Sequence, residues 1–318
     1  MSITLSVVVP ATDVPETLPL CTAALGRAAD VDEVVVVDGP RELGVCEARN
    51  TGAERATGDI VVFVDSDVEV HPDALSRVKA AFAGDPELTA VFGSYDDAPR
   101  RGGTVAVFRN LLHHHVHHSA AGPAQTFWSG LGGVRREVFL AAGGFDATHF
   151  PHPSVEDVDL GGRLIARGGR IRLDPTIQGT HLKAWTLRSM VFTDFARRGV
   201  PWVGLLLRSG RSSTALNLGW RHRASAAACV TTVLATLTGR PRVAAAALLT
   251  LVGLNHPFYR LLARRRGWRE AALGVGLHVV HLLTAVASVP AGVVVHISRS
   301  RRRGPEACGA GTNSGEHR

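Results

Sequence analysis

Two carboxylates stand one residue apart directly after a long apolar run, in the stretch VVFVDSDVEV. The run predicts a buried strand, and Asp65 and Asp67 follow its end. Converging carboxylates repel one another and lose hydration unless a cation or hydrogen-bond donors complete the site. Hard cations such as Mg²⁺ and Mn²⁺ take oxygen ligands, often including substrate phosphates. The pair therefore indicates a metal-bridged nucleotide diphosphate, with an ordinary turn rich in Asp and Ser as the alternative.

A second acidic group, in PSVEDVDLGGRL, contains Glu156, Asp157 and Asp159. A carboxylate at the start of a helix can take a proton from an attacking hydroxyl, which accelerates a reaction by about 10²–10⁴-fold. Asp157 and Asp159 do not share a helix face, because neighbours on a face are three or four residues apart. Asp159 is therefore expected to have a structural or acceptor-orienting role. The alternative for all three is acidic residues that favour the dipole at a helix N-terminus.

Strand-length apolar runs alternate with helical patterns in the front half of the chain, which is typical of βαβ units and a parallel sheet. Strands are predicted at 5–9, 33–38, 59–65 and 88–93, and helices near 16–28, 46–57 and 72–83. Asp38 ends the second strand, as Asp65 ends the third. Because ligands bind at the carboxyl ends of parallel strands, the carboxylates of Asp38, Asp65 and Asp67 are expected at one edge of the sheet.

Six elements, in this order, resemble the family 2 glycosyltransferases over roughly residues 3–205. They are the VVVP strand, the EVVVVDG strand, ARNTG, VDSD, the RREVF…GGFD segment, and the EDVDL…RL helix with a histidine after it. The resemblance implies a GT-A fold, an α/β domain with a Rossmann-like, mixed and mostly parallel sheet. It also implies an enzyme of the hexosyltransferase type that uses a UDP-, GDP- or dTDP-sugar as donor.

The resemblance implies roles for single residues. Asp157 would be the general base, with Glu156 beside it as a second catalytic candidate. The expected metal ligands are Asp65, Asp67 and His181, holding Mn²⁺ or Mg²⁺ at the donor phosphates. The expected donor-binding residues are Pro10, Asp38, Gly39, Arg49, Asp65 and Arg198. For Arg198, an arginine that snorkels at a membrane surface is the alternative.

Two departures from the family pattern bear on the reaction. DGPRE follows the second strand in place of DDGS, so only one carboxylate is available for the nucleotide base or ribose. The QxxRW signature of processive synthases is replaced by DFARRGVPW, which contains Arg197, Arg198 and Trp202. We therefore expect a single, non-processive transfer to a lipid-linked or glycan acceptor. Because no second carboxylate is evident as a covalent nucleophile, inversion of the anomeric centre is expected.

The charge of the chain is divided between its two parts. Residues 1–181 carry 15 Lys and Arg against 24 Asp and Glu, a net −9, whereas residues 182–318 carry 20 against 4, a net +16. An acidic front and an Arg-rich, apolar back suit a cytosolic domain held on anionic lipid headgroups. Nucleic-acid binding is the least favoured function, because the basic character is confined to the tail.

Other patterns in the sequence are weak as sites. No Walker A or GxGxxG sequence is present, and the four cysteines lack the CxxC spacing of a zinc site. The run HHHVHH, residues 113–118, brings histidines together at i, i+4 but has no HExxH partner. A solvent-facing helix or an acceptor-side loop is expected there.

The chain becomes strongly apolar from about residue 224. One run, AALGVGLHVVHLLTAVASVPAGVVVHI, exceeds the roughly 20 residues that a membrane span needs. Two shorter runs before it predict a helical hairpin that turns at GRPR. We expect two or three transmembrane helices within 224–298, a linker over 206–223 and a disordered tail over 299–318. The protein would be a multi-pass protein of the cell membrane with a cytoplasmic catalytic domain, and a buried helical domain is the alternative.

Two rival functions use the same residues differently. A GT-A-like nucleotidyltransferase would need a Gly-rich N-terminal loop with a basic residue, which VVVPATDVPETL lacks. A non-catalytic membrane scaffold with a decayed site is disfavoured, because Asp38, Asp67 and Asp157 are all present.

Overall fold

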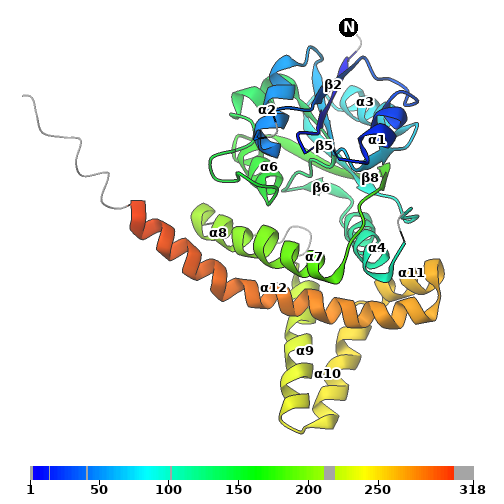
Figure 1. The fold of residues 1–318 in the computed structure, drawn as a ribbon, viewed down its shortest axis with the longest axis vertical. Helices are drawn as coiled ribbons and strands as arrows, with labels where there is room; N and C mark the ends of the chain where they lie inside the picture. The colour runs from blue at the N-terminus through cyan, green and yellow to red at the C-terminus, as the bar shows by residue number, and fades with distance from the viewer. Residues whose placement is uncertain (1–2, 14, 41, 101, 211–218, 304–318) are drawn as a thin grey trace, which may run out of the picture.

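The computed structural model describes residues 3–13, 15–40, 42–100, 102–210 and 219–303 (Figure 1). The strands are β1 (Leu5–Pro10), β2 (Glu33–Val37), β3 (Ile60–Val64), β4 (Val68–Val70), β5 (Leu88–Tyr95), β6 (Gly122–Ala124), β7 (Leu131–Arg135) and β8 (Arg170–His181). In this part of the chain they form an eight-stranded sheet of order β2-β1-β3-β7-β5-β8-β4, with β6 paired to β8. Strands β1, β2, β3, β5 and β8 run in one direction, and the other three run against them. The sheet is therefore mixed, as expected.

Six helices cover the two faces of this sheet. They are α1 (Leu18–Leu25), α2 (Val45–Arg55), α3 (Ala74–Gly84), α4 (Thr104–Ser119), α5 (Arg136–Ala141) and α6 (Glu156–Ala166). The predicted strands near β1, β2, β3 and β5 and the predicted helices near α1, α2 and α3 are confirmed within a few residues. The continuous apolar runs therefore correctly predicted strands buried on both faces, as β1, β3 and β5 are along their whole length.

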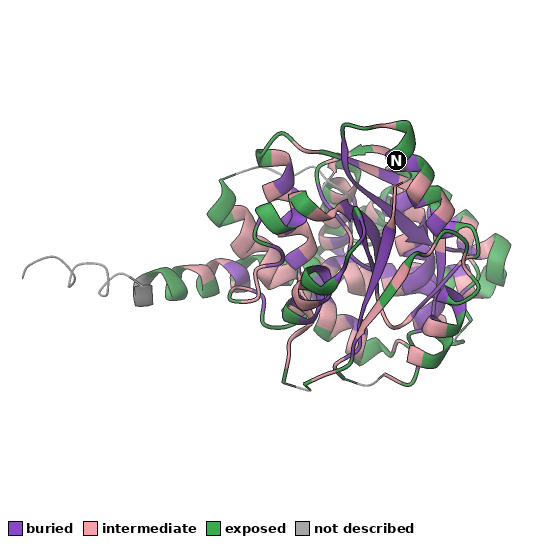
Figure 2. Cartoon of the chain, turned by 90° about the horizontal axis from the view of Figure 1, so that it is seen from above, coloured by how far each residue is buried: buried purple, intermediate pink, exposed green. Residues whose placement is uncertain are grey.

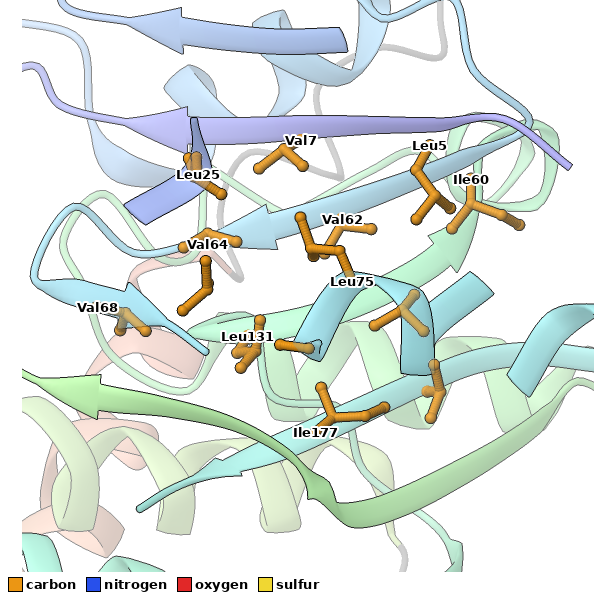
Figure 3. Packing of buried hydrophobic residues seen from close by; sticks show 14 of the residues in the cluster. Leu5, Val7, Leu25, Ile60, Val62, Val64, Val68, Leu75, Leu131 and Ile177 are labelled. Carbon is orange, nitrogen blue, oxygen red and sulfur yellow. The ribbon is translucent and has the colours of Figure 1, made fainter. Parts of the chain in front are cut away.

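Alternate residues of each strand pack into different cores. Val7 and Val62 face the layer that contains α1 and α3, where Figure 3 shows them with Leu75 and Ile177. Val8 and Phe63, their neighbours in the chain, face the layer of α2, α5 and α6. Figure 2 shows the strands as the most buried part of the molecule. The carboxyl ends of β1, β2 and β3 are thus held by packing on both sides.

A helical region follows the sheet. It contains α7 (Leu187–Phe192), the π-helix η1 (Thr193–Gly199), α8 (Val200–Ser209), α9 (Trp220–Leu237), α10 (Pro241–Leu254), α11 (His256–Arg266) and α12 (Trp268–Arg303). The expected hairpin is present, because α9 and α10 lie against each other and turn at Gly239 and Arg240. Figure 1 shows this hairpin pointing away from the sheet, while α12 runs across it, alongside α7 and α8.

The expectation of several membrane spans is not supported. Among the described residues, one helix, Trp268–Ser300, is long and apolar enough to cross a membrane, and only 22% of its most apolar window is buried. Helix α10 is apolar but shorter than a span. Helix α12 also continues to Arg303, five residues into the segment that was expected to be disordered. The rest of that segment, 304–318, and the linker residues 211–218 lie outside the described residues.

The histidine run faces solvent only in part: His118 is exposed, whereas His114 and His117 are buried. It lies on α4, where His114 and His117 are 9% and 3% exposed. Their Nδ1 atoms donate to the carbonyl oxygens of Tyr95 and Gly93, at 2.9 and 2.8 Å. A break in register between β5 and β8 at Phe92 and Ser94 lies beside these acceptors. Imidazole N–H groups thus satisfy carbonyls at an irregular part of the sheet, which explains their burial.

Candidate active site

Helix α2 brings the ARNTG segment to the edge of the sheet. The N-terminus of α2 is capped by the side chain of Glu47, whose Oε2 accepts a hydrogen bond from the N–H of Gly44 at 2.9 Å. The Asn50 amide donates to the carbonyl of Phe145 and accepts the N–H of the same residue, at 2.9 and 2.8 Å. This reciprocal pair fixes α2 to the GGFD segment and sets the Arg49 guanidinium 5.3 Å from the centre of the Phe145 ring.

Arg49 connects the two acidic groups of the sequence. Its Nη2 lies 2.7 Å from Asp65 Oδ1 and its Nη1 lies 2.9 Å from Glu156 Oε1. The second oxygen of Glu156 accepts the N–H of Ser154 at 2.7 Å. Arg49 and Glu156 are both 4% exposed. Because removing one partner would leave a buried charge unpaired, breaking this cross-link between α2, β3 and α6 would cost about 3–5 kcal/mol.

Asp67 lies beside a histidine. Its Oδ2 is 3.6 Å from His181 Nε2, and its carbonyl accepts the N–H of Leu182 at 2.8 Å. The ring of His181 stacks on Tyr95, with centroids 4.2 Å apart and planes inclined by 13°. Burial disfavours the charged form of Asp67, but the hydrogen bond and charge of His181, helped by Lys183, lower its pKa below the usual value. Asp67 is therefore kept ionised beside an imidazole nitrogen.

The donor set at this place fits a divalent cation. Asp67 supplies oxygen and His181 supplies nitrogen, a combination that Mn²⁺ accepts. In the described part of the chain no group of three or more His, Cys, Asp or Glu is arranged to hold a metal. A cation there would complete its shell with oxygens from substrate phosphates, as Mg²⁺ commonly does. The predicted ligand Asp65 lines the same pocket, and its Oδ1 is paired with Arg49.

Asp157 differs from Glu156 next to it. It lies in the first turn of α6, and within the described ranges no ion pair engages it. Its Oδ1 accepts the N–H of Val158 at 2.8 Å. Burial, followed by the negative charge of Glu156, raises the pKa of Asp157 to about 7, against the opposing pull of Arg49 and Arg198. A carboxylate with this pKa is suited to accept a proton near neutral pH.

Gly161 allows α6 to pack closely against the loop that contains Phe127. A Cβ atom at Gly161 would lie 2.4 Å from the backbone nitrogen of Phe127, so only glycine allows the helix this close to the neighbouring loop. Asp159, in the first turn of α6, forms an ion pair with Arg163 one turn later, with 2.8 Å between Asp159 Oδ2 and Arg163 Nε. This pair fits the structural role that was expected for Asp159.

Most of the predicted site residues line one pocket of about 250 Å³. They are Arg49, Asp65, Asp67, Glu156, Asp157, His181 and Arg198. Three predicted residues are not part of its lining. Pro10 ends β1, and Asp38 and Gly39 follow β2, so they lie along the same edge of the sheet as Asp65. Pro10 is buried and Asp38 is exposed.

A second wall of the pocket is cationic and aromatic. Lys183, Arg197 and Arg198 line it, and among the residues that the structure describes no carboxylate forms an ion pair with them. Trp185 has Lys183 Nζ and the guanidinium of Arg109 each 4.8 Å from its ring centre. These charges come from the segment after β8 and from η1, opposite the acidic residues of β3 and α6.

Buried polar atoms with no hydrogen-bond partner gather around this pocket. Among the described residues they include Arg49 Nε, both ring nitrogens of His113, Ser154 Oγ and Trp202 Nε1, and all four residues line the pocket. Leaving such an atom unsatisfied costs about 1–3 kcal/mol. The concentration of these atoms in one place indicates a site that is completed by a polar ligand.

A family model described as glycosyl transferase family 2 matches residues 39–141, which include Arg49, Asp65 and Asp67. The chain contains a family 2 glycosyltransferase domain. The match spans less than half of the chain and ends before Asp157 and His181. The place of these two residues in the glycosyltransferase domain therefore rests on the geometry of the pocket.

Two curated relatives of this domain are similar over short stretches. The glucosyl-dolichyl phosphate glucuronosyltransferase of Haloferax volcanii is 32% identical over 65 residues, 20% of this chain and 21% of the relative. The pre-mycofactocin glycosyltransferase of Mycobacterium tuberculosis is 29% identical over 177 residues, 50% of this chain and 36% of the relative. The chain thus covers well under two thirds of the length of the curated relatives it matches.

A solved structure extends the likeness over nearly the whole chain. The mannosyltransferase PcManGT from Pyrobaculum calidifontis, solved with GDP-Man and Mn²⁺, covers 91% of this chain and 87% of its own with a TM-score of 0.54. At 18% identity, this likeness concerns the fold. The glycosyltransferase domain has the GT-A fold that its sequence pattern predicted.

Several residues that line the pocket of the glycosyltransferase domain were not predicted from the sequence. Lys183 and Trp185 follow His181 in the segment HLKAW, and Lys183 is one of only two lysines in the chain. That rarity and the position after His181 are the signals that could have pointed to them. Arg109 and Trp128 carry no comparable signal, because they come from α4 and from the loop before β7.

Proposed function

We propose that this protein transfers one sugar at a time from a nucleotide-diphosphate-sugar donor to a hydroxyl of a membrane-associated acceptor, with inversion at the anomeric carbon. One observation carries the proposal. A single pocket combines the Asp67–His181 pair, the cations Lys183 and Arg198, and the unpaired carboxylate of Asp157. Glycosyl transfer needs these three features, which respectively hold the phosphates, offset their charge and take the proton.

Lys183, Arg197 and Arg198 offset the negative charge that grows on the departing nucleoside diphosphate. None of them forms an ion pair with a carboxylate of the described residues, so they can make charge-assisted contacts to the donor. Charge-assisted hydrogen bonds from such groups to phosphate are about twice as strong as neutral ones. The donor-binding role predicted for Arg198 remains part of the proposal, and Pro10, Asp38 and Gly39 would contact the nucleoside at the adjacent edge of the sheet.

Asp157 removes the proton from the acceptor hydroxyl as its oxygen bonds to the anomeric carbon. The bond from that carbon to the phosphate oxygen breaks at the same time, and its electron pair leaves with the nucleoside diphosphate. One displacement from the face opposite the phosphate inverts the anomeric centre. Glu156 does not act as the base, because both of its oxygens already accept hydrogen bonds, one from Arg49 and one from the N–H of Ser154. It holds Arg49 and the start of α6 in place.

Asp67 and His181 would hold a Mn²⁺ or Mg²⁺ ion, with Asp65 nearby. When bound, the ion acts as a Lewis acid toward the phosphate oxygens of the donor. Oδ1 of Asp65 stays paired with Arg49, and this ion pair holds the end of β3 against α2.

The helical region would bring the protein to a membrane on the cytoplasmic side. Exposed apolar residues are frequent on it: Leu207, Leu234, Leu237, Leu249, Leu273, Val289, Val294 and Ile297. A bilayer is a fitting cover for such a surface. The Haloferax relative is named for glucosyl-dolichyl phosphate, a lipid-linked sugar, which supports a lipid-linked acceptor here.

The direct test is release of nucleoside diphosphate by the detergent-purified protein with UDP-, GDP- and dTDP-sugars, in Mn²⁺, Mg²⁺ or EDTA, with membrane lipid extract as acceptor source. The proposal predicts turnover of at least one donor, lost in EDTA and in Asp67→Ala. An Asp38→Ala variant serves as the control for nucleoside binding, because it should weaken donor binding without removing metal dependence. Silence of the folded protein with every donor would favour the scaffold function instead.

A further inference from the structure

A second hollow of about 350 Å³ adjoins the active-site pocket. It lies between the loop around Phe150, helix α8 and the last turns of α12. Ser154 and Arg197 line both hollows, so the two are neighbours. Ser154 stands three residues before Asp157. An acceptor bound in the second hollow would therefore reach the carboxylate that takes its proton.

The second hollow is cationic. Arg197, Arg208 and Arg299 line it together with three histidines, and no carboxylate is among its lining residues in the described part of the chain. The guanidinium of Arg208 lies 5.6 Å from the centre of the Phe150 ring, which holds it at one side of the hollow. Arg208 comes from α8 and Arg299 from α12, so two different helices supply guanidinium groups to the hollow. A phosphate is the kind of group that guanidinium groups bind.

The remaining walls of the hollow are apolar. Val200, Pro201 and Val295 line it, and the helices that carry them lie close together. A Cβ atom at Gly292 would lie 2.6 Å from Val203 Cβ, so α12 touches α8 through a residue without a side chain. Leu207 and Val294 beside the hollow are 48% and 62% exposed. A hollow lined by exposed guanidinium groups, with exposed apolar residues on the same two helices, suits an amphiphile better than a free anion.

We propose that this hollow binds the phosphate of a lipid-linked acceptor, with Arg208 and Arg299 on the phosphate and the hydrocarbon chain lying along the exposed apolar residues Leu207 and Val294. The proposal rests on the proposed function, because it supplies the acceptor for Asp157. The donor occupies the other pocket, with Lys183 and Arg198 on its diphosphate, and Arg197 lies between the two. The acceptor class is thus a phosphate ester of a long apolar alcohol, either as such or carrying a sugar.

The test measures binding without turnover, using the full-length protein in neutral detergent. The probes are a polyprenyl monophosphate, the matching polyprenol and inorganic phosphate, each titrated and followed by native mass spectrometry. Binding of a nucleoside diphosphate with Mn²⁺ is measured in parallel. The wild-type protein is compared with the double variant Arg208→Ala/Arg299→Ala. Arg269→Ala, at the opposite end of α12 and outside the hollow, controls for the loss of charge from this helix.

Removing two charge-assisted contacts should weaken polyprenyl phosphate binding by about tenfold or more. Arg269→Ala should bind it like the wild type, and binding of the nucleoside diphosphate should persist in both variants. Unchanged lipid binding in the double variant would overturn the proposal, and so would inorganic phosphate binding as tightly as the lipid. Failure of the wild type to bind any nucleoside diphosphate would instead contradict the proposed function, so the two failures are distinguishable.

Discussion

The two walls of the active-site pocket are built in opposite ways. On the wall formed by β3, α2 and α6, the buried guanidinium of Arg49 is paired with both Asp65 and Glu156. On the wall formed by the end of β8 and by η1, Lys183, Arg197 and Arg198 face the pocket without an ion pair to a carboxylate of the described residues. The Arg49 network on the first wall thus has its partners within the protein, whereas the cations of the second wall have none among the described residues.

This difference separates residues that build the site from residues that act on substrate. Paired, buried charges fix geometry, and removing one partner is strongly destabilising because it leaves an unmatched buried charge. Unmatched groups, including Asp157, cost stability and are available for chemistry. Glu156 and Asp157 are neighbours in the chain, yet they fall on different sides of this division. Variants of the two walls should therefore change different measurements.

The largest effect is expected on the paired wall. Glu156→Ala leaves Arg49 with one partner in a buried place, so the protein should lose about 3–5 kcal/mol of stability. The melting temperature should fall by roughly 10 °C. Asp159→Ala, which removes the more exposed pair with Arg163 from the same helix, should cost about 0.3–1 kcal/mol. Equal losses in the two variants, measured by thermal unfolding, would erase the distinction between the walls.

Substitutions on the wall with the unpaired cations should lower the activity and leave the stability of the protein unchanged. Arg198→Ala removes a cation that faces the diphosphate, so kcat/KM should fall by about 10–100-fold. The melting temperature should stay within a degree or two, because no ion pair of the described residues is lost. Arg188→Ala, an exposed arginine on α7, should leave both quantities unchanged. A large drop in melting temperature for Arg198→Ala would show that the second wall is structural as well.

The pH dependence follows from Asp157. Burial and the charge of Glu156 raise its pKa to about 7, and the ionised form is the one that accepts a proton. Activity should therefore fall about tenfold per pH unit below 7 and level off above it. A pH profile of kcat/KM with a saturating metal concentration measures this. A profile that is flat between pH 5 and 8 would remove Asp157 from the role of base.

A smaller effect of opposite sign is expected on stability. Because the folded-state pKa of Asp157 lies above its unfolded value near 4, the folded protein binds the proton more tightly. Stability from this group is present at low pH and is lost as pH rises toward 7. Asp157→Asn removes the buried charge and should stabilise the protein at pH 8 by on the order of 1 kcal/mol. Destabilisation at pH 8 would mean that Asp157 makes contacts that the ionised form needs.

The sheet and the acidic half of the site were predictable from the sequence. Apolar strands such as VVFV are buried on both faces, and parallel strands place Asp65 and Asp67 at one edge. Burial of the histidine run was not predictable. His114 and His117 donate to carbonyls beside an irregularity between β5 and β8. Such a break in register depends on a pairing between strands far apart in the chain.

Side-chain partnerships were equally out of reach. The sequence EDVD does not show whether Glu156 or Asp157 pairs with Arg49, because the answer depends on how α6 packs at Gly161. The helical region shows the same limit. The hydropathy of α12 indicated a membrane span, and its length and composition agree, but the sequence did not predict that the helix crosses the α9–α10 hairpin alongside α8, as Figure 1 shows. Length and composition report whether a helix can cross a membrane, and packing decides how it lies.

The assignment of Asp157 as the base is tested by comparing sugar transfer by the wild type, Asp157→Asn and Glu156→Gln with a donor that the wild type accepts. Nucleoside diphosphate binding is followed in the same preparations. We predict that Asp157→Asn binds the nucleotide normally, melts no lower than the wild type and transfers about 10²–10⁴-fold more slowly. Glu156→Gln should lose melting temperature. Transfer by Asp157→Asn within a few-fold of the wild-type rate would contradict the assignment of Asp157 as the base.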